Sequence, residues 1–145
     1  MDTNVLIAII SAASSIVIAS LSYFFSKKRE VEGEWRKQKL TQYRELLSSL
    51  SDCAIDGINN DEAQRRFSQA FNTIALVAPQ KVIRVLLAFH DEIAFSNPNP
   101  SKERHDQLLK ELVLAIRQDM KLSPADDAEN FQFRLIGRAP KKKSS

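Results

Sequence analysis

The sequence predicts an all-α protein: an N-terminal transmembrane helix, then a four-helix cytosolic bundle with a short extended C-terminal arm. Three observations lead to this prediction. Residues 5–25 contain no charge, proline or glycine. The whole chain has only three glycines and few β-branched alternations, which favours helices over strands. Its apolar residues recur at helical spacing between breaks rich in proline and asparagine.

Residues 5–25 form an apolar run long enough to cross a bilayer. At about 1.5 Å per residue, a helix of this length spans roughly 30 Å, the thickness of the hydrocarbon core. A cleaved signal peptide fits less well, because residues 1–4 contain no lysine or arginine and the run ends in bulky aromatic residues. A buried core helix also fits less well, because such helices rarely extend this far without a charge. We therefore expect a single-pass membrane anchor.

The charges on either side of this run predict its orientation. All 21 lysines and arginines follow it, and Asp2 is the only charge before it. The positive-inside rule then places the N-terminus outside and the C-terminal domain in the cytoplasm. Four side chains are expected to contact lipid headgroups at the inner interface: Tyr23, Lys27, Lys28 and Arg29.

The predicted span also carries small residues at spacings of three and four, on one face of a helix. This association face consists of Ala8, Ser11, Ala12, Ser15, Ala19 and Ser22. Small residues let membrane helices approach closely, and serine hydroxyls can bond across the contact. Self-association is one interpretation, and a polar lining for a narrow pore is another. In the third interpretation, the small residues have no role in association, and each serine hydroxyl bonds the backbone of its own helix.

Residues 27–51 are predicted to form a juxtamembrane helix that continues into the bundle. Its apolar residues follow a 3-4-3 spacing and form a juxtamembrane seam of Leu40, Tyr43, Leu47 and Leu50. From Ser51 to Asn60 the chain is rich in aspartate and asparagine, which indicates a turn. Asn59, with Glu62 three residues later, resembles a capping box that opens the next helix.

The helical domain is expected over residues 52–136, with further helices at 61–77, 79–95 and 102–122. Pro79 suits a first helical turn, and Ser101 suits an N-cap. The alternation of Phe131, Phe133 and Leu135 predicts an extended arm laid across the bundle. A disordered basic tail is expected at 137–145, and the N-terminal tail with the transmembrane helix occupies 1–26.

Composition sets limits on partners. Outside the anchor, 21 basic residues face 17 acidic ones, and much of the excess lies at the two ends. A basic patch of Arg65, Arg66 and nearby cations would have few aromatic residues among it, so nucleic acid is not favoured as a partner. Cys53 is the only cysteine, which allows no internal disulfide and suits a reducing compartment.

No pattern of residues predicts a reaction, a cofactor, a metal site or a small-molecule substrate. His90 and His105 lack zinc-ligand spacing, and Cys53 has no nucleophile signature around it. The acidic residues near Asp52 do not match a calcium loop. Arg84 and His90 formally fit the Arg-x(4–6)-His pattern of HEPN ribonucleases. Six residues apart on a helix, however, they lie about 120° from each other.

Part of the C-terminal sequence resembles a known group. Residues 112–120, then Ser123-Pro124, then residues 131–135, resemble the C-terminal signature of a group of uncharacterised bacterial single-pass inner-membrane proteins with a small cytosolic helical domain. The resemblance implies a bacterial inner-membrane protein and no activity. Arg117 and Asp119 are the polar positions of the signature, and a salt bridge from them is expected to tie the last helix to the arm.

The function expected from these features is that of a membrane-anchored protein-interaction or oligomerisation module without catalysis. Its partners would be the lipid bilayer and either a second copy or another protein. One alternative is a small membrane effector, a pore or leak former, of a bacterial defence-type system. The other is a HEPN-like ribonuclease that uses Arg84 and His90.

Overall fold

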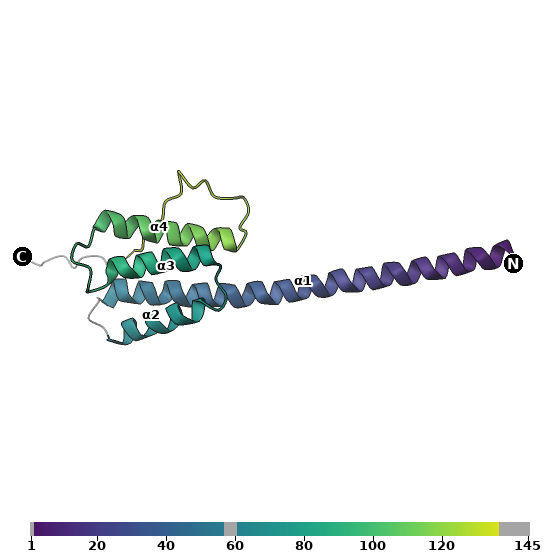
Figure 1. Ribbon diagram of the computed structural model, residues 1–145, viewed down its shortest axis with the longest axis horizontal. Coiled ribbons are helices and arrows are strands. Elements are labelled where there is room, and N and C mark those ends of the chain that lie inside the picture. Colours follow the sequence, from purple (N-terminus) through teal and green to yellow (C-terminus); the bar gives the residue numbers. More distant parts are fainter. Residues whose placement is uncertain (1, 57–60, 137–145) are drawn as a thin grey trace, which may run out of the picture. The chain divides into compact units, whose positions relative to one another are not determined.

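The protein is all-helical over the part of the chain that its structure describes. The structure is a computed structural model that describes residues 2–56 and 61–136, with four helices and no strand among them (Figure 1). The helices are α1 (Thr3–Asp56), α2 (Asp61–Ile74), α3 (Gln80–Ile93) and α4 (Lys102–Asp119). The predicted all-α class and the long apolar N-terminal helix are therefore confirmed.

The chain divides into two compact units, residues 1–38 and residues 39–145, and α1 contributes to both. The first unit is the N-terminal part of α1. Every side chain from Asp2 to Gln38 is exposed. The second unit holds the rest of α1 together with α2, α3 and α4, and it contains the hydrophobic core.

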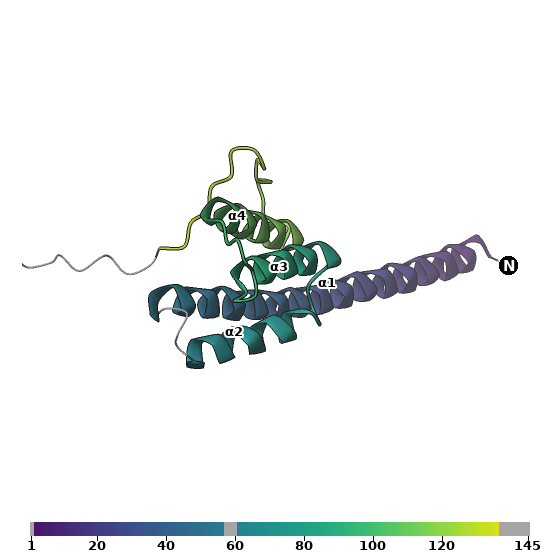
Figure 2. The same ribbon diagram turned by 60° about the vertical axis from the view of Figure 1, so that its left-hand side comes forward.

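The core of the second unit draws side chains from all four helices. Figures 1 and 2 show α2 beside the C-terminal part of α1, and α3 between that part and α4. The most fully buried large side chains are Tyr43, Leu46, Ile74, Val82, Leu86, Phe89 and Leu112. Each apolar stripe therefore meets at least one neighbouring helix, which is how an amphipathic helix is stabilised in water.

Several helix ends in the second unit differ from the sequence prediction, among them α2, which ends at Ile74 rather than at 77, and α3, which ends at Ile93 rather than at 95. Residues 51–56 continue α1 as helix, so the predicted turn from Ser51 is wrong for these residues. Leu50 is buried, and Cys53 packs against the core, so tertiary packing outweighs the turn preference of the aspartates. The predicted Asn59 cap lies outside the described residues. The third helix begins at Gln80, and Pro79 is its extended N-cap residue rather than part of its first turn.

The ends of α4 are fixed by local hydrogen bonds. At the N-terminus, the Ser101 hydroxyl accepts a hydrogen bond from the Arg104 N–H at 3.3 Å, which confirms the predicted cap. At the other end, the Leu122 N–H donates to the Arg117 carbonyl, and the Lys121 N–H donates to the Gln118 carbonyl. This pair of bonds is a Schellman motif. It puts Lys121 at a φ of 51° and ends α4 at Asp119, before the predicted Leu122.

After α4 the described chain has no helix or strand as far as Ile136. Phe131, Phe133 and Leu135 are half-buried, and the residues between them are exposed. Phe133 and Leu135 pack against the core of the second unit. The predicted basic tail at 137–145 lies outside the described residues.

Candidate functional site

The predicted membrane span forms one uninterrupted stretch of helix in α1. By length and composition, α1 is the one helix of the described chain that could cross a membrane, and its apolar window is entirely unburied. Among the described residues, twelve of the twenty exposed large apolar side chains lie in residues 5–25. The chain itself therefore leaves this apolar surface uncovered, unlike a core helix.

The small residues of the predicted association face share one side of α1. At 100° per residue they fall within an arc of about 100° around the helix. Within the span, the hydroxyls of Ser14, Ser15 and Ser20 donate to backbone carbonyls four residues earlier, at 2.8–2.9 Å. Of these, only Ser15 belongs to the association face. Its hydroxyl donates to the backbone of its own helix, as the third interpretation of the small residues expects. Such a bond leaves the hydroxyl oxygen able to accept a second hydrogen bond.

Acidic residues lie beside two of the predicted headgroup contacts. Lys27 pairs with Glu30 at 2.9 Å, and Lys28 lies 4.0 Å from Glu32. Tyr23 is 72% exposed. Local pairing reduces the net positive charge that the first two lysines offer to an anionic surface. Arg29 has no ion pair among the described residues.

The juxtamembrane seam lies partly in the protein's own core. Tyr43 and Leu50 are buried and Leu47 is half-buried, whereas Leu40 is 46% exposed. Leu46 is fully buried, although the 3-4-3 spacing omits it. The buried face is thus centred between Tyr43 and Leu46, and Leu40 falls about 90° away from that centre.

A polar cluster joins α1 to the end of α4 inside the second unit. The Lys39 ammonium donates to both carboxylate oxygens of Asp119 at 3.0 Å, and the Tyr43 hydroxyl donates to Asp119 at 2.7 Å. The Lys39 and Asp119 side chains are 18% and 13% exposed. Burial first, and then the hydrogen bond and charge of Asp119, raise the pKa of the Tyr43 hydroxyl far above its usual range. No local sequence pattern predicts this contact.

The other polar residue of the C-terminal signature points the opposite way. Arg117 donates two hydrogen bonds to Asp126, at 2.8 and 2.9 Å, and its guanidinium lies 5.7 Å from the centre of the Phe131 ring. The hydrogen bonds from Arg117 lower the pKa of the Asp126 carboxyl. Arg117 therefore makes the expected tie to the following segment, whereas Asp119 faces α1.

The basic residues that were considered for nucleic acid are engaged with acids. Arg65 pairs with Glu62, and Arg66 pairs with Asp52 and Glu45. These pairs leave little uncompensated charge on α2.

The residues considered for metal or RNA chemistry form no metal-ligand group in the described part of the chain, and Arg84 and His90 do not border a common cavity. The described residues hold no group of three or more potential ligands that could bind a metal ion. His90 packs against Phe71, with ring centroids 5.4 Å apart, and His105 packs against Phe89 at 5.2 Å. Both histidines border one cavity of the second unit, and Arg84 does not.

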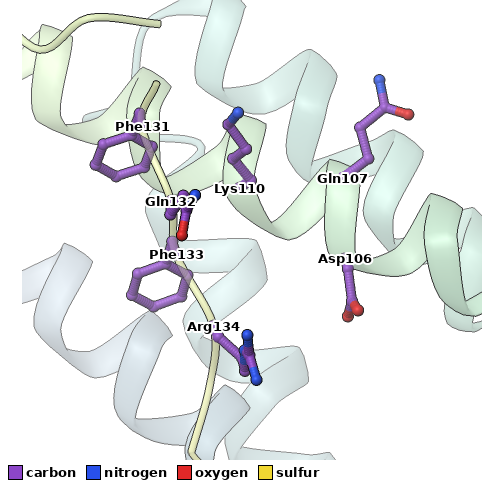
Figure 3. A pocket seen from close by; sticks show the side chains of 7 residues that line it. All are labelled: Asp106, Gln107, Lys110, Phe131, Gln132, Phe133 and Arg134. Atoms are coloured by element: carbon purple, nitrogen blue, oxygen red, sulfur yellow. The ribbon is translucent and has the colours of Figure 1, made fainter. Parts of the chain in front are cut away.

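That cavity has a volume of about 820 Å³ and lies at the end of the second unit where α1 and α3 end and α2 and α4 begin. The side chains of Leu50, Phe67, Phe89, Leu109 and Leu135 form much of its wall. A smaller cavity of about 500 Å³ lies between α4 and residues 131–134. Figure 3 shows Phe131 and Phe133 on one side of that segment and Arg134 on the other.

Comparison with models of protein families, with curated proteins and with solved structures finds no match to this chain. The resemblance of residues 112–135 to bacterial inner-membrane proteins therefore stays a prediction.

Proposed function

We propose that this protein is a single-pass membrane protein whose helical unit binds other protein chains, first of all a second copy of itself. In this proposal the C-terminal unit is a four-helix cytosolic bundle with an extended arm at 131–136. The observation that carries the proposal is the unequal covering of apolar surface in α1. Residues 5–25 leave theirs exposed, while from Tyr43 onward the apolar side chains of α1 are largely buried in the core.

The environment that would cover residues 5–25 is a bilayer, because a solvent-exposed apolar helix of this length is costly in water. The positive-inside rule favours an N-terminus outside and a C-terminal unit in the cytoplasm of a bacterial inner membrane. Asn99 provides a test, because it is exposed in the loop between α3 and α4. In a Cys53→Ser, Asn99→Cys variant, a membrane-impermeant maleimide should label intact cells only after the inner membrane is permeabilised.

Within a bilayer, the association face is the part of α1 that best suits a second copy. Lipid tails are as apolar as isoleucine, so helices associate there through close packing and hydrogen bonds rather than through the hydrophobic effect. Six alanines and serines within one arc allow that approach, and β-branched side chains occupy much of the rest of the helix.

The test compares leucine substitutions on and off this face of the same helix. Ser15→Leu and Ala12→Leu should weaken self-association about 3–30-fold, the range for the loss of an interhelical hydrogen bond or close contact. Ser14→Leu and Ser20→Leu are the matched controls, because both serines lie outside the arc and make the same backbone bond as Ser15. Energy transfer between labelled copies in lipid vesicles reports the association.

The outcomes separate self-association from binding to another protein. Dimers that Ser15→Leu dissociates support the proposal. Another outcome is a monomer that consistently co-purifies with one other membrane protein, and Ser15→Leu abolishes this co-purification. That result would support binding through the association face, with the other protein as the partner instead of a second copy. A strictly monomeric protein with no bound chain would overturn the proposed function.

A further inference from the structure

The cavity of about 820 Å³ in the second unit has the size and lining of a small-molecule site. Ligand cavities in proteins usually have volumes of about 300–1,000 Å³, largely apolar walls and a few polar groups that orient the ligand. Residues from α1, α2, α3, α4 and the segment at 134–135 all contribute to this one. It is also more enclosed than the smaller cavity shown in Figure 3.

The apolar part of the lining comes from side chains that the core holds in place. Leu50, Phe67, Phe89 and Leu109 are each at most 7% exposed, so their positions are fixed by packing behind the cavity wall. Ile93 and Leu135 are half-buried and extend the same wall. Such a wall suits an aliphatic or aromatic body, because a polar ligand would lose its hydrogen bonds to water there.

The polar part of the lining consists of Gln64, Ser68, His90, Lys102, His105, Asp106 and Arg134, of which Lys102 and Arg134 carry a positive charge. Lys102 and Arg134 border the cavity, are exposed, and have no ion-pair partner among the described residues. The acidic residue of the lining, Asp106, has a side chain that is 57% exposed, and its carboxylate lies 3.1 Å from the Nδ1 atom of His105. His90 completes the polar lining on the α3 side, where it faces Asp91 at 3.6 Å.

We propose that this cavity binds a free amphipathic carboxylate, such as a medium-chain aliphatic acid. The hydrocarbon body would lie against the apolar wall, and the carboxylate would accept hydrogen bonds from Arg134 and Lys102. Arginine is suited to this role, because its planar guanidinium can bind both oxygens of a carboxylate at once. The cavity lies wholly within the second unit, so the proposal stands whether or not the membrane helices associate.

Cys53 makes the proposal measurable, because it lines the cavity and is the only cysteine of the chain. The full-length protein in lipid nanodiscs is alkylated with N-ethylmaleimide, and the modified fraction is followed by intact mass. Octanoate should slow the reaction in a saturable manner. Octyltrimethylammonium, which has the same chain length and the opposite charge, should bind about tenfold or more weakly, because it loses the charge-assisted hydrogen bonds. Octan-1-ol, which has the same chain length and no charge, measures the contribution of the hydrocarbon chain alone.

Two variants and one matched control locate the carboxylate. Lys102→Gln and Arg134→Gln should each weaken protection by octanoate about 5–10-fold, and they should leave the effect of octan-1-ol unchanged. Lys110→Gln is the control, because Lys110 is also on α4 but borders only the smaller cavity. Circular dichroism checks that each variant is folded. Lys102 is exposed in the first turn of α4, so its replacement leaves the core intact.

Protection by octanoate that exceeds that of both other probes, and that depends on Lys102 or Arg134, supports the proposal. Equal protection by all three probes would show that the cavity binds apolar molecules without selecting for a carboxylate, and this result would overturn the proposal. Absence of protection by octanoate in the folded wild-type protein would overturn it as well. Equilibrium dialysis with radiolabelled octanoate provides the independent measure of affinity.

Discussion

The Tyr43 hydroxyl donates a 2.7 Å hydrogen bond to Asp119, a residue 76 positions away in the sequence. The same carboxylate accepts two further hydrogen bonds from Lys39. One acidic side chain thus connects the point where α1 enters the second unit with the last residue of α4. Breaking a largely buried charged contact leaves its partners unsatisfied, which costs more than the contact itself contributes.

Replacement of Asp119 should therefore destabilise the helical unit strongly. Asp119→Ala leaves the Lys39 ammonium without its counter-charge and the buried Tyr43 hydroxyl without an acceptor, so we expect a loss of about 2–4 kcal/mol in the free energy of unfolding. Denaturant unfolding of the full chain, followed by circular dichroism, measures it. Asp91→Ala is the control, since that side chain is 81% exposed and should change stability by less than about 0.5 kcal/mol. Equal effects of the two variants would contradict the structural role.

The raised pKa of the Tyr43 hydroxyl predicts a loss of stability at alkaline pH. The folded state favours the protonated phenol, so this stabilisation is complete below the unfolded-state pKa of about 10 and falls as the pH rises above it. Tyr23 is the only other tyrosine, so a Tyr23→Phe variant isolates the signal. In this variant the absorbance of tyrosinate at 295 nm should rise only at the pH at which the circular dichroism signal of the helices is lost. Reversible ionisation near pH 10 in the folded protein would be inconsistent with a buried, hydrogen-bonded phenol.

The Arg117–Asp126 pair should hold the segment after α4 in place. Arg117→Gln removes the charge and the forked pair of hydrogen bonds, and it weakens the contact with Phe131. Amide hydrogen exchange at residues 126–136 should then become faster, while exchange in α2 stays as in the wild type. Arg104→Gln, an exposed change elsewhere on α4, provides the comparison. Unchanged exchange in Arg117→Gln would mean that Phe133 and Leu135 alone anchor the segment.

The same pair has a predictable response to acid. The Asp126 carboxyl has a lowered pKa in the folded protein, so its contribution is present above the unfolded-state value of about 3.9 and is lost as the pH falls through the folded-state pKa. A carboxyl carbon NMR titration should place the Asp126 midpoint below that of an ordinary aspartate. In Arg117→Gln the midpoint should move up, and an unmoved midpoint would assign the shift to another group.

The position of the buried face of α1 can be tested with two leucines that are six residues apart. Leu46 is fully buried, so Leu46→Ala should cost about 2–4 kcal/mol in the free energy of unfolding. Leu40 is 46% exposed, and Leu40→Ala should cost less than about 1 kcal/mol. The reverse order would show that the juxtamembrane seam, rather than the face centred near Leu46, forms the core.

Local patterns predicted the helices well, because each has an apolar stripe and visible breaks. The Ser101 cap and the loop around Pro98 could also be predicted from the local residue pattern. The rotation of α1 about its axis could not be predicted from the sequence, because a 3-4-3 spacing describes both the juxtamembrane seam and the buried face through Leu46. Asp119 could not be matched to Lys39, because nothing local connects residues 80 positions apart. The cavity was equally hidden, since it requires five segments to converge.

Disulfide cross-linking of neighbouring positions in native membranes shows whether the membrane helices pair through the association face. In a Cys53→Ser background, Ser11→Cys and Ser15→Cys should form linked dimers on oxidation, because both residues lie within the arc. Ser14→Cys and Ser20→Cys, outside the arc, should remain largely monomeric. Equal cross-linking at Ser14→Cys and Ser15→Cys, or none at any position in membrane-bound protein, would show that the helices do not pair through this face.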